Sequence, residues 1–191
     1  MNTALTTSNE LISKADYLAG ELLASERHEY VNGCVYAMAG ASKRHNRIAG
    51  NIYRAVMVAG SACTAYISDM KVHSDKYQSY YYPDVVGCDP NETDEYVLEN
   101  PCLIVEVTSD STLRKDYLEK SLAYQAISSV QVYLIVAQDQ VQVDMLTRAS
   151  DGAWELQQFN ELGVELSLSF PLLSLSMTAI YEKQPHNNIH L

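Results

Sequence analysis

Long apolar runs are absent from this 191-residue chain. No segment approaches the roughly 18 uninterrupted apolar residues that a membrane-spanning helix requires. The first residues also lack the basic start and apolar stretch of a secretion signal. We therefore expect a cytoplasmic protein without a membrane segment.

Closely spaced cysteine pairs are absent as well. The four cysteines stand far apart, at Cys34, Cys63, Cys88 and Cys102, and none belongs to a Cys-x-x-Cys motif. Structural zinc sites favour such close pairs, and disulfide frameworks are typical of short secreted chains. The pattern argues against both and fits reduced, buried thiols.

Positive charge is scarce, with 13 lysines and arginines against 24 acidic residues and a net charge of −11. This balance excludes a protein that coats nucleic acid by bulk electrostatics, although it allows a local basic patch. Lys43, Arg47 and Arg54 would share one face of an expected helix, opposite an apolar stripe that includes Ile48 and Ile52. That face is either an ordinary solvated surface or a surface that meets phosphates.

The length and the 47% apolar composition fit one domain, residues 1–191, with flexible polar ends at 1–12 and 184–191. Apolar periodicity predicts helices at 14–24, 43–59 and 114–127. Asn32-Gly33 between two β-prone runs predicts an N-terminal hairpin over 29–36. Further strands are expected at 63–73, 79–88, 102–108, 130–136, 141–146 and 154–159, an acidic loop at 89–100, and a helix or extended segment at 172–181.

The strand at 102–108, the helix after it and the strand at 130–136 form a crossover unit. In a common sheet such a unit makes the two strands parallel and the connection right-handed. We therefore expect an α/β fold in which two helices flank a mixed sheet and the hairpin lies across one end.

Lys120 is the most informative single residue. An α-helix over 114–127 places it in the inward-facing stripe, together with Leu113, Tyr117, Tyr124 and Ile127. A buried ammonium group needs a carboxylate or an anionic ligand to offset its desolvation. Candidate carboxylates belong to the two apolar strands before it, Asp84 in Tyr-Tyr-Pro-Asp-Val-Val and Glu106 in Leu-Ile-Val-Glu-Val-Thr.

If these two strands are neighbours, both carboxylates can reach one hard cation, which prefers oxygen ligands. Such an ion lowers the pKa of a bound water and neutralises charge on a scissile phosphate, and Lys120 would then orient the nucleophile or stabilise the pentavalent state. The alternative is structural. In it, Asp84 and Glu106 lie at strand ends near solvent and Lys120 extends its ammonium group to water.

The order of these elements, with Pro-Asp on one strand and Glu on the next, resembles the PD-(D/E)XK nuclease superfamily. More closely, the chain is similar to the Uma-type family of putative restriction endonucleases. The similarity covers residues 26 to 148 and rests on the segments Glu26–Gly33, Met38–Asn46, Tyr82–Val86, Leu103–Ser109 and Asp116–Tyr124.

This resemblance implies a restriction-endonuclease-like fold with an αβββαβ core, and Asp84 and Glu106 as ligands of Mg²⁺ or Mn²⁺. The chain departs from the superfamily pattern at Thr108, which stands where a lysine follows the glutamate by two positions. Lys120 is the cation that would take its place. Glu29, in the hairpin, is a third acid that would complete the metal shell or hold Lys120.

Three of these assignments have plain structural alternatives. Glu29 can be an exposed cross-strand partner of Tyr36. His45 can be a core or capping histidine in place of a general base. Asp69 and Lys71, on one strand face, can form an ordinary surface pair in place of contacts to metal or DNA.

We expect a Mg²⁺-dependent endonuclease that acts on DNA, with Asp84, Glu106, Lys120 and Glu29 in the active site. A homodimer suits the cutting of two antiparallel strands. Two other classes remain open. One is a non-catalytic module that binds nucleic acid or a protein through the same fold, and the other is a metal-free acid/base hydrolase that uses Asp84 and Glu106.

Overall fold

The computed structural model describes residues 11–59, 63–109 and 112–182. Most of the two ends expected to be flexible, 1–12 and 184–191, therefore lies outside the described residues. Ile12 is described, and its N–H donates to the carbonyl of Gly33 at 2.9 Å. No helix in the described ranges is long and apolar enough to cross a membrane.

The central element is a six-stranded mixed sheet. Its strands lie in the order β11 (Trp154–Phe159), β10 (Val143–Arg148), β9 (Val132–Ala137), β8 (Pro101–Thr108), β6 (Val85–Cys88) and β3 (Thr64–Ile67). Only β8 and β9 pair in parallel, and the other neighbours are antiparallel. The predicted mixed sheet and the parallel crossover are both confirmed.

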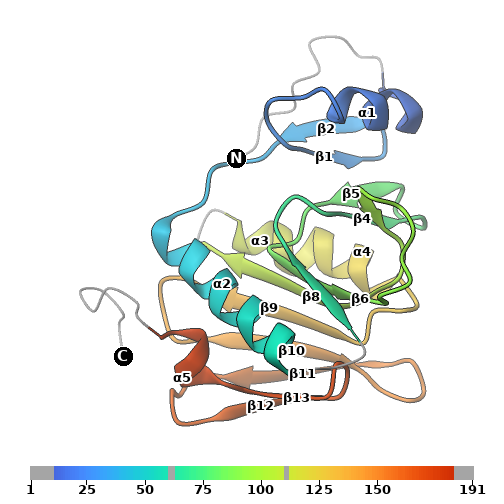
Figure 1. The fold of residues 1–191 in the computed structure, drawn as a ribbon. Helices are drawn as coiled ribbons and strands as arrows, with labels where there is room; N and C mark the ends of the chain where they lie inside the picture. Colours follow the sequence, from blue (N-terminus) through green and yellow to red (C-terminus); the bar gives the residue numbers. More distant parts are fainter. Residues whose placement is uncertain (1–10, 60–62, 110–111, 183–191) are drawn as a thin grey trace.

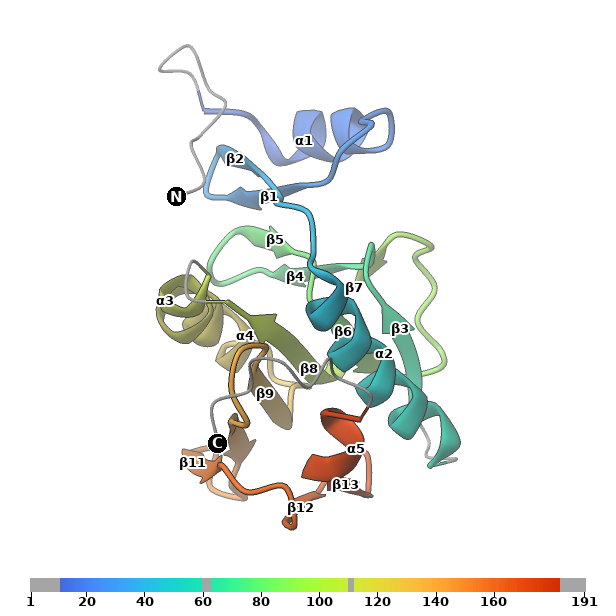
Figure 2. The same cartoon turned by 90° about the vertical axis from the view of Figure 1, so that its left-hand side faces the viewer.

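Helices cover the two faces of this sheet, as predicted (Figures 1 and 2). On one face lies α2 (Lys43–Val58). Ser42 is its N-cap, and the Ser42 side chain accepts a hydrogen bond from the N–H of His45. Its apolar stripe packs against β6 and β8 in the larger core. On the other face, Tyr124 packs on Ile104 and Tyr133 in the second core.

The helical segment on the second face has three parts. These are α3 (Leu113–Lys115), the π-helical turn η1 (Asp116–Lys120) and α4 (Ser121–Gln125). The predicted helix at 114–127 is thus present but not α-helical throughout. Leu113, expected to face inward, is 40% exposed, because the π-turn changes the register of the residues before it relative to those after it.

The N-terminal hairpin belongs to a second, five-stranded sheet. Its order is β2 (Cys34–Ala37), β1 (His28–Val31), β5 (Ser79–Tyr81), β4 (Lys71–Ser74) and β7 (Val97–Leu98). The helix α1 (Lys14–Glu21) and the hairpin occupy one end of the molecule (Figure 1). Asn32 and Gly33 both have positive φ, the geometry of a tight hairpin turn.

Two of the expected strands are each broken in two, which the sequence prediction missed. The stretch 63–73 divides at Ser68 and Asp69, both with positive φ, into β3 and β4. The stretch 79–88 divides at Tyr82-Pro83-Asp84 into β5 and β6. In both cases the two halves belong to different sheets, so the chain passes twice between the five-stranded and the six-stranded sheet.

The C-terminal part adds a ribbon and a short helix at the opposite end (Figure 1). The ribbon pairs β12 (Glu165–Leu168) with β13 (Leu173–Ser176), and α5 (Met177–Ile180) follows it. The expected segment 172–181 is therefore extended first and helical afterwards. Within the acidic loop 89–100, only Val97 and Leu98 form a strand.

Candidate active site

Asp84 and Glu106 lie side by side where β6 and β8 pair. Val85 is the partner of Val105 in this antiparallel ladder, so Asp84, just before β6, is level with Glu106. Asp84 Oδ2 also accepts from the N–H of Val107 at 2.6 Å. The neighbouring strands that the sequence analysis required are therefore present, although Asp84 precedes its strand and does not lie within it.

Lys120 ends the π-turn and points inward, as predicted. Its Nζ lies 2.9 Å from Glu106 Oε1, 3.0 Å from Glu29 Oε1 and 3.4 Å from Asp116 Oδ1. The residue is only 6% exposed, so the alternative in which its ammonium group reaches solvent is wrong. Three carboxylates meet its three N–H donors, and no contact joins it to Asp84 in the described residues.

The acids around Lys120 are buried and crowded. Burial raises the pKa of Glu106 well above its usual range; Lys120 opposes this shift, while Asp116, Asp84 and Glu29 add to it. Burial likewise raises the pKa of Asp116, against the pull of Lys120. Burial alone would lower the pKa of Lys120, but its three carboxylate partners raise it well above the usual value. The three carboxylates therefore favour the charged ammonium form of Lys120.

Glu29 connects the hairpin to this cluster. It lies opposite Tyr36 in the ladder, as expected, yet it is only 3% exposed. Its two oxygens face Lys120 and Lys115. Although burial acts to raise the pKa of Glu29, these two ammonium groups lower it below the ordinary value. The exposed-partner alternative is therefore wrong, and Glu29 is a buried anion that holds both lysines.

Two further contacts fix the strand acids. His45, in the first turn of α2, places Nε2 3.1 Å from Asp84 Oδ2. Burial of His45 acts to lower its pKa, but Asp84 raises it above the usual value. Tyr124, one turn after Lys120, donates its hydroxyl to Glu106 Oε1 at 2.7 Å. His45 is thus neither a core residue nor only a cap, because it faces the acidic cluster.

One cavity of about 540 Å³ lies between the two sheets and the N-terminal end of α2, and its lining includes Glu29, His45, Asp84, Glu106 and Lys120. Asp69 reaches its mouth and pairs with Arg27 at 3.6 Å. Lys71 does not line this cavity. It is buried under the rings of Tyr82 and Tyr96, so the expected surface pair of Asp69 and Lys71 is not formed.

A family model described as "Putative restriction endonuclease", Uma2, matches residues 15–178. The chain belongs to the Uma2 family. The family and the restriction-endonuclease-like fold predicted from the sequence are both confirmed. The αβββαβ order is present as α2, β3, β6, β8, the helical segment 113–125 and β9.

Similar proteins are found in Synechocystis and Anabaena. The uncharacterized proteins slr1290 and sll1609 of Synechocystis sp. (strain ATCC 27184 / PCC 6803 / Kazusa) are 33% and 30% identical to this chain. The matches cover 89% and 87% of this chain, and 91% and 97% of the relatives. A crystal structure of "a putative nuclease belonging to DUF820" from Anabaena variabilis ATCC 29413 superposes with a TM-score of 0.62. At 15% identity, over 84% of this chain and 94% of that one, it supports the fold alone.

In this Uma2 chain Thr108 stands where the superfamily pattern has a lysine, and the structure shows a different lysine beside Glu106. Thr108 is 2% exposed and lines a different cavity, together with Tyr117 and Asp144. The ammonium group nearest to Glu106 comes from Lys120 on the helical segment, at 2.9 Å. A cation thus reaches the strand acid from the helix, as the sequence analysis expected.

The residues present fit a hard divalent cation. Both contacts of Glu106 fall on Oε1 and both contacts of Asp84 fall on Oδ2, so Oε2 and Oδ1 meet no donor in the described chain. Six carboxylates line the cavity against two ammonium groups, those of Lys115 and Lys120, and the guanidinium group of Arg27. Within 11–59, 63–109 and 112–182, no group of three or more His, Cys, Asp or Glu side chains is arranged as a metal site. Mg²⁺ nevertheless commonly binds through one or two carboxylates and several waters.

Sequence reasoning missed Asp116 and Lys115 as members of this cluster. Asp116 precedes Lys120 by four positions, a spacing that commonly pairs an acid with a lysine on a helix. That signal could have identified Asp116. Lys115 had no comparable signal, because its contact to Glu29 joins residues 86 positions apart.

Proposed function

We propose that this Uma2 protein is a divalent-metal-dependent endonuclease that hydrolyses DNA phosphodiester bonds. One observation carries the proposal. Asp84 and Glu106, on adjoining strands, each keep one carboxylate oxygen without a donor in a cavity where acids outnumber ammonium groups. Mg²⁺ or Mn²⁺ is the cofactor that suits this oxygen-rich, anionic site.

Asp84 and Glu106 would hold the ion. Such an ion lowers the pKa of a bound water and neutralises charge on the scissile phosphate. The contacts of His45 and the Val107 N–H with Asp84, and of Tyr124 with Glu106, orient the two ligands. A ligand whose second oxygen is already bonded loses little side-chain freedom when the ion binds.

Lys120 would act as a cation and not as a base, because its carboxylate partners keep it protonated. Its ammonium group would orient the attacking water or stabilise the charge on the oxygens of the pentavalent phosphate. Glu29 and Asp116 would hold it in place. They are positioning residues, since neither is required as a ligand of the ion.

We also propose that residues 1–191 act as one domain and assemble as a two-fold homodimer. Two antiparallel DNA strands present two scissile phosphates related by a two-fold axis, and two-fold dimers are the commonest assembly. Light scattering across a concentration series tests this part separately.

Cleavage of supercoiled plasmid with and without Mg²⁺ or Mn²⁺ tests the proposed activity. Wild type should nick or linearise the plasmid only with the metal. Asp84→Asn and Glu106→Gln should each lose at least roughly 100-fold in rate, since the ion is worth several kcal/mol of transition-state stabilisation. Glu155→Gln, on the exposed strand β11, is the matched control and should cleave as wild type does.

The competing function is a nuclease-fold module that binds DNA or a protein without cleavage. The full engagement of Lys120 by carboxylates and the threonine at position 108 favour it. Calorimetry separates the two. A module without a metal site should release no heat with Mn²⁺, whereas the endonuclease should bind Mn²⁺ and lose it in Asp84→Asn. Cleavage that survives a chelator would instead indicate metal-free acid/base hydrolysis.

A further inference from the structure

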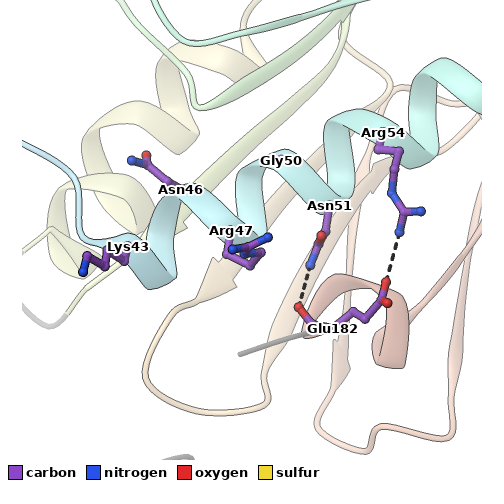
Figure 3. A pocket seen from close by; sticks show the side chains of 7 residues that line it. All are labelled: Lys43, Asn46, Arg47, Gly50, Asn51, Arg54 and Glu182. Atoms are coloured by element: carbon purple, nitrogen blue, oxygen red, sulfur yellow. Dashed lines mark hydrogen bonds and ion pairs between the residues drawn. The ribbon is translucent and has the colours of Figure 1, made fainter. Parts of the chain in front are cut away.

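A second cavity, of about 570 Å³, runs along the outer side of α2 (Figure 3). We call it the α2 groove. Apart from Gly50, its lining residues carry polar or charged side chains: Lys43, Asn46, Arg47, Asn51, Arg54 and Glu182. No residue of the proposed metal site belongs to it.

The groove concentrates positive charge in an acidic protein. Lys43, Arg47 and Arg54 are exposed, and the first two form no ion pair with any described residue. Arg54 pairs with Glu182 at 3.1 Å. Lys43 and Arg47, which no described acid neutralises, form a local anion-attracting surface on a chain of net charge −11.

The groove adjoins the active-site cavity. Asn46 lines both cavities, and Ser42 and His45, also at the start of α2, line the active-site cavity. Lys43 is the first residue of α2 and directly follows Ser42, which lines the active-site cavity, and Arg47 and Arg54 follow along the helix (Figure 3). From Lys43 to Arg54 the helix rises about 16 Å, the length of several nucleotides.

The shape of the groove also suits a close ligand. A Cβ built on Gly50 would meet nothing within 4 Å, so an approaching phosphate can come near the helix backbone there. The neighbouring Asn51 amide is anchored to the carbonyls of Ile180 and Glu182, at 3.0 and 3.1 Å. One wall is therefore fixed before any ligand arrives.

We propose that the α2 groove binds the phosphodiester backbone of the DNA beside the cleaved bond, through Lys43 and Arg47. This inference rests on the proposed function, because it identifies the substrate as a strand long enough to reach from the metal site along α2. The contacts would be to phosphates alone, so they would position DNA without reading its sequence.

Salt-dependent DNA binding tests the proposal. Anisotropy of a labelled duplex is measured with a chelator between about 50 and 200 mM salt, where each phosphate contact contributes roughly 0.9 to the slope of log K against log salt. The Lys43→Gln/Arg47→Gln double variant should reduce the slope by up to about 1.8. The control Lys14→Gln/Lys76→Gln removes the same charge far from α2 and should leave the slope near that of wild type.

Gly50 provides a second pair of variants. Gly50→Ala adds one uncharged methyl group to the groove and should weaken binding less than Gly50→Glu does. Gly50→Glu places a carboxylate between Arg47 and Arg54 and should weaken binding at least as much as the loss of one lysine. Circular dichroism confirms that both variants keep the helix.

The proposal would be overturned if the wild type and the Lys43→Gln/Arg47→Gln variant had equal slopes of log K against log salt. It would also be overturned if both double variants lost the same amount of slope, or if the wild type did not bind the duplex. These outcomes differ from failure of the proposed function. If wild type cleaves but the groove variants bind as it does, only the groove proposal fails. If the slope falls as expected but no metal supports cleavage, the groove stands and the endonuclease does not.

Discussion

Lys120 is the residue on which the cluster depends. Its ammonium group is the shared partner of Glu29, Glu106 and Asp116, all of them at most 4% exposed. Removing one member of a buried ionic cluster leaves the others uncompensated, which is strongly destabilising. The cluster therefore influences stability as well as the proposed chemistry.

Lys120→Met should lower the free energy of unfolding by about 3–5 kcal/mol, the range for an uncompensated buried charge. Lys115→Met is the control and should lower the free energy of unfolding by less. The Lys115 side chain is 24% exposed, and Glu29 would still have Lys120 as an ion-pair partner. Urea unfolding of both variants measures the difference. Equal losses would show that Lys120 is not the centre of the cluster.

Metal binding should depend on pH through Glu106. Burial and neighbouring acids raise the pKa of Glu106, so below that pKa the side chain holds a proton that a cation must displace. Affinity for Mn²⁺ should therefore fall as pH falls through the raised pKa, at a higher pH than for an ordinary glutamate, and level off above it.

Calorimetry at about pH 6 and pH 8, in buffers of different ionisation enthalpy, measures both the affinity and the protons released. Proton release should be greater at the lower pH. An affinity that is the same at both values, without proton release, would contradict the raised pKa of Glu106.

At the residue level the sequence predicted several of the side chains that the structure brings together in one cavity. Lys120 was identified because an ammonium group in an apolar stripe is unusual, and Glu106 and Asp84 because each interrupts an apolar strand. The contacts of Lys115 with Glu29 and of His45 with Asp84 could not be predicted in the same way. They join residues 86 and 39 positions apart, so they depend on how the hairpin and α2 meet the sheet.

At the level of elements, the π-turn η1 places both Asp116 and Lys120 in the interior, where Lys120 Nζ lies 3.4 Å from Asp116 Oδ1. The hairpin matters as much, since it carries Glu29 into the same cluster. A change in the hairpin turn should therefore alter the position of Glu29 in the cluster.

Gly33→Ala should destabilise the protein by at least about 1–2 kcal/mol, the cost of a left-handed conformation for a residue with a Cβ. Gly33 has φ of +89°, and the new Cβ would lie 2.7 Å from the Cβ of Leu11. Gly50→Ala, in open space within α2, should instead stabilise by about 0.5–1 kcal/mol. Thermal unfolding compares them, and a neutral Gly33→Ala would refute the turn geometry.

Elements with a clear period were predicted within a few residues, among them α2, β8 and β11. The division of each of the expected strands 63–73 and 79–88 into two shorter strands was not predicted. Each stretch is β-prone on both sides of a short interruption, Ser68-Asp69 in the first and Pro83-Asp84 in the second. The first is divided by the positive φ of Ser68 and Asp69. Non-glycine residues adopt that conformation only when the surrounding structure supports it, so local sequence does not reveal it.

At the scale of the whole molecule, the two sheets and α2 bring chemistry from distant segments to one cavity. Glu29 comes from the five-stranded sheet, Glu106 from the six-stranded sheet and His45 from α2. The net charge of −11 would repel DNA over most of the surface, so productive encounters would depend on the basic side of α2.

The central claim is that Asp84 and Glu106 share one divalent ion. The most direct test is a crystal soaked in Mn²⁺ and measured for anomalous scattering. A single strong peak in contact with both carboxylates, absent from crystals of Asp84→Asn, is the expected result. No peak between the two side chains in well-diffracting soaked crystals, or a peak bound elsewhere, would contradict the account.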